Sequence, residues 1–250
     1  MSGHNKWSNI QHRKGAQDAK RSKVFTKIIR ELTVAAREGG DANSNPRLRT
    51  AIEKAREANM PKDKMETAIK KGTGELGGEE LFELTYEGYG PDGVALIISV
   101  VTDNKNRSAQ EIRHILSKHG GSLAESGAVS WNFEKKSLFS IPKDEIQDSE
   151  EFMMQAIEAG ADDIDDSEDP VEVKGAPDAV ATVRDALSGF GYTVKAELVY
   201  EPKTTVSVSG SSAEKVMKLL NALDENDDVQ DVYGNYDIDD EEMERIAESL

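Results

Sequence analysis

The chain of 250 residues contains no cysteine. This absence excludes disulfide bridges, thiolate nucleophiles and zinc sites with cysteine ligands, and it fits a reducing compartment. The longest apolar run, residues 94–101, is as long as a strand and far too short to cross a bilayer. The first residues include no apolar segment typical of secretory signals. We therefore expect a soluble cytoplasmic protein without a membrane partner.

Motifs for catalysis and cofactor binding are also missing. The glycines within residues 88–93 match GxGxxG by letter, but they precede a predicted strand instead of joining a strand to a helix. His114 and His119 lack the HExxH spacing of a metal site. The acidic loop 162–169 has Glu168 where a calcium loop has glycine, so a solvated loop or a weak divalent-ion site remain as alternatives. We expect no enzyme activity, catalytic residue, metal site, cofactor or small-molecule substrate.

Positive charge is scarce overall and concentrated at one end. The formal net charge is −17, yet residues 1–71 hold 17 Lys and Arg against 8 Asp and Glu, a net charge of +9. The remainder holds 14 basic and 40 acidic residues, a net charge of −26. A basic module of this kind suggests a nucleic-acid partner, and the acidic remainder would repel the same polyanion and so orient the complex.

The basic end divides into an arm and a helix. The arm, residues 1–21, has little apolar content. Its Trp7 can either stack on a base or anchor the arm to the body of the protein, and anchoring is the commoner role of a lone tryptophan. Residues 22–38 place apolar side chains at helical spacing on one face and cations on the opposite face. Acids barely interrupt these cations, so we expect this cationic face to bind phosphates.

Further candidate residues lie in the next helix, residues 47–58, and in the polar loop 104–107. For the loop, an ordinary strand-to-helix turn is an equal alternative. Contacts from all these side chains would hold phosphates with little reading of bases. The predicted nucleic-acid-binding residues are Lys6, Trp7, Arg13, Lys14, Lys20, Arg21, Lys23, Lys27, Arg30, Arg37, Arg47, Arg49, Lys105 and Arg107.

Periodicity predicts three helices at the N-terminal end, over residues 22–38, 47–58 and 62–71, which form a helical bundle within residues 22–76. Strand patterns follow at residues 82–87, 94–102 and 128–133. Between the last two strands, Ser108 and Glu111 resemble a capping box at the start of a helix. This segment therefore has the order ββαβ.

The order βαββαβ of residues 135–203 is typical of a ferredoxin-like unit. Residues 204–238 add βαβ, which is too small to fold alone but completes the ββαβ segment. We therefore predict a multidomain α+β protein in which a three-helix bundle precedes two ferredoxin-like domains. One domain, residues 78–134 plus 204–238, is interrupted by the other, residues 135–203. The acidic tail, residues 239–250, is expected to be frayed or a peripheral helix.

Long motifs of the chain closely resemble the YebC/PmpR family. They include GHNKWSNIQHRKGAQDAKRSKVFTKIIREL, AIEKAREANMPKDKMETAIKKGTG, YEGYGPDGVALI, TDNKNRSAQEIRHILSKHGGSL and SGAVSWNFE. The resemblance runs almost end to end and is densest over residues 3–133. It implies a helical domain and two α+β domains in a DNA-binding transcriptional regulator. Mitochondrial relatives act as translational activators, and bacterial relatives have been linked to the ribosome, so the resemblance leaves DNA and RNA open.

Three functions are consistent with these patterns. The first is a nucleic-acid-binding regulator of transcription that binds DNA through its basic helical face. The alternative is a ribosome-associated translation factor that binds ribosomal RNA. The third is an adaptor whose acidic α+β domains bind proteins.

Overall fold

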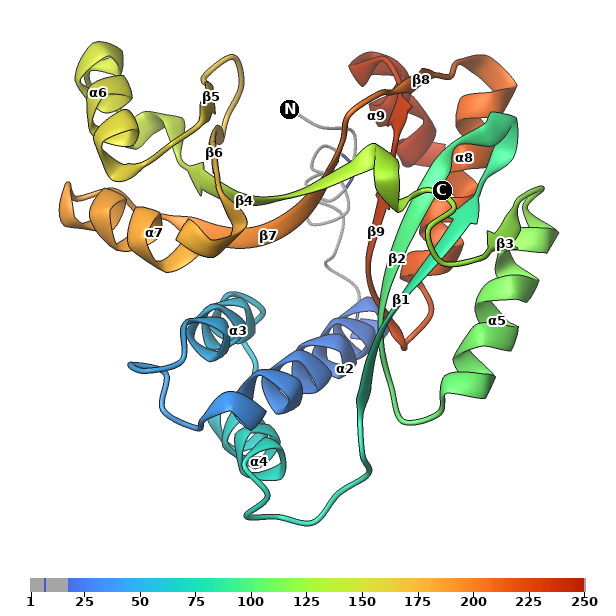
Figure 1. Ribbon diagram of the computed structural model, residues 1–250, viewed down its shortest axis with the longest axis horizontal. Helices are drawn as coiled ribbons and strands as arrows, with labels where there is room; N and C mark the ends of the chain where they lie inside the picture. The colour runs from blue at the N-terminus through green and yellow to red at the C-terminus, as the bar shows by residue number, and fades with distance from the viewer. Residues whose placement is uncertain (1–6, 8–17, 250) are drawn as a thin grey trace. The chain divides into compact units, whose positions relative to one another are not determined.

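The computed structural model describes Trp7 and residues 18–249, with only the backbone given for residues 18–20. The chain divides into two compact units (Figure 1). Phe133–Glu201 forms one unit, and the chain before Phe133 and after Glu201 forms the other. We call them the inserted unit and the main unit. None of the helices in this described part is long and apolar enough to cross a membrane.

The main unit begins with a three-helix bundle. Its helices are α2 (Asp18–Ala35), which continues into the 3₁₀ turn η1 (Ala36–Glu38), α3 (Pro46–Glu57) and α4 (Lys62–Gly72). Asn45 begins α3, because its side chain accepts a hydrogen bond from the Leu48 amide at 3.0 Å. The same side chain donates to the carbonyl oxygens of Ala35 and Gly39, so it also ties α3 to the end of α2. The core of the bundle is small and rich in alanine.

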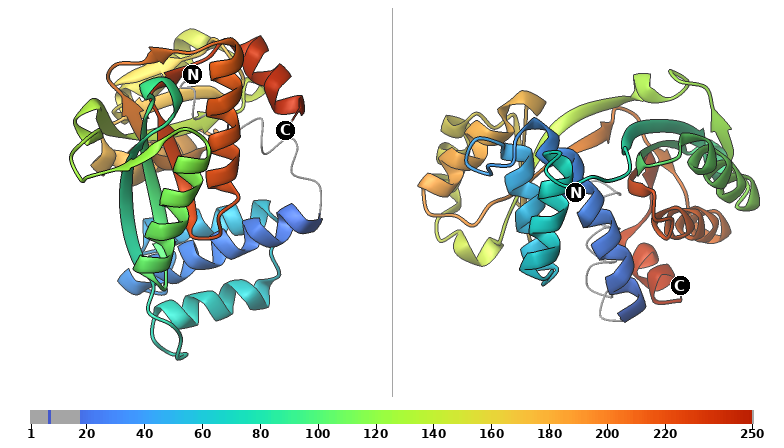
Figure 2. Two further views of the ribbon diagram at one scale, coloured as in Figure 1. Left: turned by 90° about the vertical axis from the view of Figure 1, so that its right-hand side faces the viewer. Right: turned by 90° about the horizontal axis from the view of Figure 1, so that it is seen from below.

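A glycine sets the close approach of α4 to α2, which lie side by side in Figure 2. A Cβ atom on Gly72 would lie 2.2 Å from the carbonyl oxygen of Thr33 and 2.7 Å from the Cβ of Ala36. The carbonyl oxygen belongs to the backbone of α2, so it cannot move away as the end of a flexible side chain could. We expect Gly72→Ala to lower the free energy of unfolding by about 1–3 kcal/mol. Gly77→Ala is the matched control in a urea titration, since no atom lies within 4 Å of its added Cβ. Equal losses in both variants would contradict this packing.

An antiparallel sheet in the order β3-β1-β2-β9 forms the body of the main unit. The chain first supplies β1 (Phe82–Tyr89), the turn η2 (Pro91–Gly93), β2 (Ala95–Thr102), α5 (Lys105–Lys118), β3 (Ser122–Ala124) and the turn η3 (Ser130–Asn132). After the inserted unit it supplies β8 (Val206–Ser207), α8 (Gly210–Asp224), β9 (Val229–Gly234), β10 (Tyr236–Asp237) and α9 (Asp240–Ser249). Side chains of α5, α8 and α9 pack with β2 and β9 in one hydrophobic core.

Two local predictions for the main unit are corrected by the structure. Asn104, and not Ser108, begins α5: its side chain accepts from the Arg107 amide, and Ser108 is buried in the first turn. The predicted strand 128–133 is largely loop, because the buried carboxylate of Glu87 accepts backbone hydrogen bonds from Gly127, Val129 and Ser130. These backbone amides are therefore not available for hydrogen bonds to a neighbouring strand. The strand in this region is β3.

Of the two alternatives expected for the tail, a frayed end or a peripheral helix, the structure shows a helix. Residues 240–249 form α9, whose Met243, Ile246 and Ala247 are buried in the core of the main unit. The charged residues of α9 lie on the opposite, outward side. The acidic tail is therefore an amphipathic helix.

The inserted unit is a four-stranded sheet in the order β5-β6-β4-β7, with two helices in the chain order βαββαβ. Its elements are β4 (Phe133–Ile141), η4 (Lys143–Glu145), α6 (Ser149–Ala159), β5 (Asp163–Asp165), β6 (Val171–Gly175), η5 (Pro177–Ala179), α7 (Val180–Gly189) and β7 (Lys195–Pro202). Phe152 of α6 and Leu187 of α7 are buried in its core. The predicted fold class, a three-helix bundle with two α+β domains, one inserted into the other, is confirmed.

Candidate nucleic-acid interface

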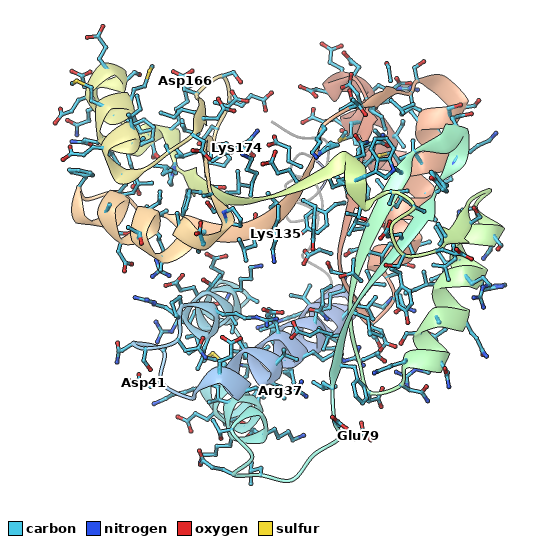
Figure 3. The ribbon with its side chains drawn as sticks, in the orientation of Figure 1. Arg37, Asp41, Glu79, Lys135, Asp166 and Lys174 are labelled. Atoms are coloured by element: carbon cyan, nitrogen blue, oxygen red, sulfur yellow. The ribbon has the colours of Figure 1, made fainter. Side chains whose placement is uncertain are left out.

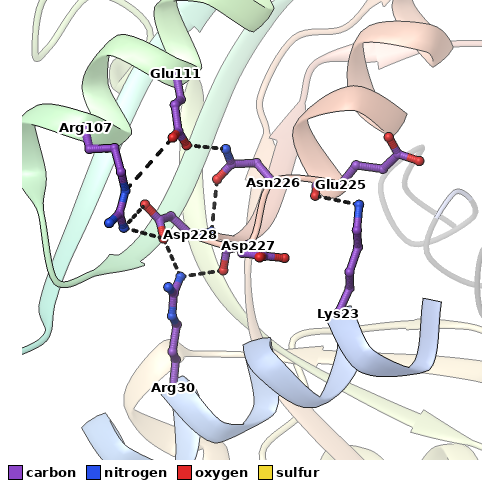
Figure 4. Close-up of a pocket in the computed structure, with 8 residues that line it drawn as sticks. All are labelled: Lys23, Arg30, Arg107, Glu111, Glu225, Asn226, Asp227 and Asp228. Carbon is purple, nitrogen blue, oxygen red and sulfur yellow. Dashed lines mark hydrogen bonds and ion pairs between the residues drawn. The ribbon is translucent and has the colours of Figure 1, made fainter. Parts of the chain in front are cut away.

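One side of α2 lies against residues 224–228, an acidic segment formed by the last residue of α8 and the loop that leads to β9. We call it the acidic loop 224–228. The ammonium group of Lys27 is 2.6 Å from a carboxylate oxygen of Asp224. Lys23 donates to the carbonyl oxygen of Glu225 at 3.1 Å (Figure 4). The cationic face predicted to meet phosphates therefore meets carboxylates and carbonyl groups of its own chain.

The centre of this contact is the buried carboxylate of Asp228. Its oxygens accept from Arg30 at 2.5 Å, from Arg107 at 3.0 Å and from the Ser108 hydroxyl at 2.5 Å. The Thr102 hydroxyl donates to it as well, at 3.0 Å. Only 4% of the Asp228 side chain is exposed. This cluster joins α2 to the start of β9 and to the first turn of α5.

The protonation of Asp228 follows from these contacts. Burial acts to raise the pKa of the carboxyl group, but the hydrogen bonds from Ser108, Arg107 and Arg30 outweigh it and hold the pKa below its usual value. The partner guanidinium of Arg107 has a raised pKa, chiefly because it donates to Asp228 and Asp103. Asp228 is therefore a buried anion at neutral pH, and two arginines are committed to it.

A polar pocket of about 430 Å³ lies beside this cluster (Figure 4). Its lining residues are Lys23, Arg30, Arg107, Glu111, Glu225, Asn226, Asp227 and Asp228. Four of these side chains are carboxylates and three are cations, and Arg30 and Arg107 are already bonded to Asp228. The pocket is not suited to hold a phosphate. Among the described residues, no group of three or more His, Asp or Glu side chains could hold a metal ion.

Other predicted site residues also have partners within the main unit. Arg47 bonds to Glu31 at 3.2 Å and to Glu83 at 2.5 Å. Burial lowers the pKa of Arg47, but these carboxylates outweigh it and raise the pKa above its usual value. The ammonium group of Lys105 lies 4.1 Å from the centre of the Phe82 ring.

The arm contributes one described side chain. Trp7 is buried, with 6% of its surface exposed, in the core of the main unit. This burial fits the role of anchor and leaves the ring unavailable for stacking on a base. Arg49 is half-buried and bonded. The predicted site residues Lys6, Arg13 and Lys14, and the side chain of Lys20, lie outside the described residues.

A second cavity has a different charge balance. It is a groove of about 180 Å³ beside α2, and its lining residues are Ile29, Arg30, Thr33, Arg37, Lys71, Gly78, Glu79 and Leu81. Three of these side chains are cations and one is a carboxylate. Arg37, labelled with Glu79 in Figure 3, is exposed and donates to the Leu81 carbonyl oxygen at 2.7 Å. This groove adjoins α4, from which Lys71 comes.

The predicted nucleic-acid-binding residues include none of the lysines of α4. We define the α4 surface as five exposed cations: Arg21, Lys62, Lys64, Lys70 and Lys71. Arg21 and Lys64 both lie against the Phe25 ring, at 5.4 and 5.5 Å from its centre. Lys64, Lys70 and Lys71 form no ion pair with any described residue, whereas Lys62 lies 3.6 Å from Glu66. In α2, Lys27 and Arg30 are paired with Asp224 and Asp228. The pair Lys70-Lys71 before Gly72 was the available signal.

Two protein-family models match this chain. Residues 5–75 match the family model of the TACO1/YebC N-terminal domain, and residues 81–236 match that of the TACO1/YebC second and third domain. The chain belongs to the TACO1/YebC family. This finding confirms the resemblance seen in the sequence, and the two models together cover parts of both units, up to residue 236.

Curated relatives of this TACO1/YebC-family chain are named "Probable transcriptional regulatory protein". The relative from Petrotoga mobilis is 67% identical and the one from Kosmotoga olearia is 62% identical, each over the whole of both chains. A crystal structure of a conserved hypothetical protein from Aquifex aeolicus is 46% identical, with a TM-score of 0.81 over 89% of this chain and 92% of that one. The curated names describe regulators and not enzymes.

Proposed function

We propose that this protein is a nucleic-acid-binding regulator of transcription that binds duplex DNA through its basic N-terminal arm and the α4 surface. The observation that carries this proposal is the α4 surface itself, in which Lys64, Lys70 and Lys71 are exposed and form no ion pair with any described residue. The names of the curated relatives support the regulatory role.

The arrangement of the α4 surface suits a phosphate backbone. Lys64 and Lys71 lie seven residues apart on the same side of a helix, which separates them by about 10 Å along its axis. Lysine is a flexible point charge that contacts phosphates without reading base edges. Arg37 and Lys71 extend the positive surface into the adjoining groove. We therefore expect tight but weakly sequence-specific binding.

The rest of the molecule supports a single orientation of the complex. Beyond residue 71 the chain carries a net charge of −26, which repels a polyanion from the α+β domains. The acidic loop 224–228 also occupies Lys23 and Lys27 of α2. The remaining route for DNA is the side of the bundle formed by α4.

Crosslinking in cells tests the choice of nucleic acid. Cells that produce the full chain are crosslinked, the lysate is sedimented, and the nucleic acid bound to the protein is sequenced. We expect recovery of promoter DNA with the protein outside the ribosomal fractions. Recovery of ribosomal RNA without promoter DNA contradicts the proposal and supports the alternative of a ribosome-associated translation factor. Recovery of neither contradicts both and leaves a protein adaptor.

A further inference from the structure

Helix α6 of the inserted unit has an apolar outer face. Its inner face supplies Phe152 and Ala156 to the core, as expected of a packed helix. On the outside, however, Met153, Met154 and Ile157 are 39%, 65% and 66% exposed. At 100° per residue these three side chains span an arc of about 100°. They form a continuous apolar strip that is not part of the core of the inserted unit.

Acidic side chains border this strip. Glu150 lies at its N-terminal end, and Glu151 and Glu158 lie along one edge, all three exposed. The surrounding unit is strongly acidic, since Phe133–Glu201 contains 18 acidic and 6 basic residues, a net charge of −12. The apolar strip favours a partner with an apolar face, and its anionic border disfavours a partner with negative charge. Together they restrict the kind of partner that can bind.

The charge excludes three occupants. Nucleic acids and anionic lipid surfaces are polyanions that this unit repels. A second copy of the chain, docked symmetrically, would bring the same glutamates against one another. A positively charged helix with one apolar face satisfies both the strip and its border.

We propose that the outer face of α6 is the docking surface for a basic amphipathic helix of a protein partner. Methionine side chains are unbranched and polarisable, so Met153 and Met154 can adapt their shape to an apolar helix face. Lysines or arginines beside that face would pair with Glu151 and Glu158. The proposal goes beyond the regulation of transcription and does not depend on the α4 surface, which belongs to the other unit.

A synthetic peptide tests this surface on the full chain. The probe is a fluorescent Leu/Lys peptide of about five helical turns, about 18 residues, with its leucines on one face. Its control has the same composition in scrambled order. In buffer of about 0.15 M salt, which screens long-range attraction beyond about 8 Å, we expect the amphipathic peptide to bind at least about tenfold more tightly than the scrambled one. Equal affinities would show charge attraction alone and overturn the proposal.

Two variants locate the binding. The double variant Met154→Gln/Ile157→Gln keeps the charge and removes the two most exposed apolar side chains. We expect it to bind the amphipathic peptide at least about tenfold more weakly, with a melting temperature within about 2 °C of the parent because surface substitutions are mild. Leu76→Gln, at a residue 42% exposed in the main unit, is the matched control and should retain the affinity. Unchanged binding by the double variant contradicts the proposal.

A label provides an independent measurement. Because the chain has no cysteine, Met154→Cys carries a single environment-sensitive dye. We expect its emission to shift to shorter wavelength when the amphipathic peptide is added, and no shift from the same dye on Leu76→Cys. If neither label responds, or both respond equally, α6 is not the docking surface.

Discussion

Replacement of Asp228 by alanine is expected to lower the free energy of unfolding of the main unit by about 2–4 kcal/mol. The carboxylate is 4% exposed and accepts hydrogen bonds from Arg30, Arg107 and Ser108. Its removal leaves two guanidinium groups beside each other without their shared anion, and breaking a buried pair in this way costs more than the pair contributes. Urea titration followed by tryptophan fluorescence measures the loss. Both tryptophans of the chain, Trp7 and Trp131, belong to the main unit.

Asp224 provides the matched control for this prediction. It forms an ion pair with the same helix, through Lys27, but half of its side chain is exposed. Pairs of this kind contribute about 0–1 kcal/mol, so Asp224→Ala is expected to cost less than about 1 kcal/mol. If the two variants lose equal stability, the buried cluster does not hold α2 to the body of the main unit.

The contribution of the same cluster to stability should depend on pH in a definite direction. The pKa of Asp228 is lowered in the folded protein, so its contribution is complete above the unfolded pKa of about 3.9. That contribution is lost as the pH falls through the lower folded value. Wild-type protein should lose this stability on acidification below about pH 4, and Asp228→Asn should lack that part of the decline.

The triple variant Lys64→Glu, Lys70→Glu, Lys71→Glu is expected to bind duplex DNA at least about 100-fold more weakly than the parent. Each lysine that contacts a phosphate releases counterions on binding, so the slope of log affinity against log salt should become shallower by about 3. The change at position 71 also places a carboxylate in the lining of the groove beside α2. Fluorescence anisotropy with a labelled duplex at several salt concentrations measures both effects.

A variant with the same net charge separates local from global effects. Lys118, Lys215 and Lys218 are exposed on α5 and α8, outside the bundle. Their reversal to glutamate changes the net charge equally, but screening beyond about 8 Å limits its influence on a distant interface at physiological salt. We expect affinity within about threefold of the parent. An equal loss in both triple variants would mean that overall charge, and not the α4 surface, controls binding.

Reversal of the α2 cations is a poorer test of DNA binding. Arg30→Glu would place a carboxylate beside the buried carboxylate of Asp228, and Lys27→Glu would face Asp224. Loss of binding in such a variant would follow from loss of structure. Lys64, Lys70 and Lys71 have no such partners among the described residues, so their reversal reports on the proposed interface.

Much of the fold was predictable because local periodicity and tertiary packing agree. The α2, α3 and α4 helices follow apolar spacing, and Asn45-Pro46 marks the start of α3. The insertion could be inferred because two incomplete segments together make one α+β domain. The start of α5 was missed because Asn104 and Ser108 are both capable caps, and only the buried Asp228 decides that Ser108 lies inside the helix.

The contacts of the α2 cations were harder to predict, because their partners lie far away in the sequence. Lys27 and Asp224 are 197 positions apart, as are Arg30 and Asp227. Periodicity along α2 shows which side is cationic, but it does not show what that side faces. Predictions for the arm residues Lys6, Arg13 and Lys14 stay predictions, while Trp7 illustrates how an aromatic residue in a polar segment can belong to a core.

The salt dependence of binding by the full wild-type chain shows whether the protein contacts a phosphate backbone. If the five cations of the α4 surface contact phosphates, the log-log slope on duplex DNA is about −4 or steeper, since each contact contributes about −0.9. A slope near zero, or affinity that does not change between low and physiological salt, would contradict the account that this protein binds a phosphate backbone through its basic N-terminal module.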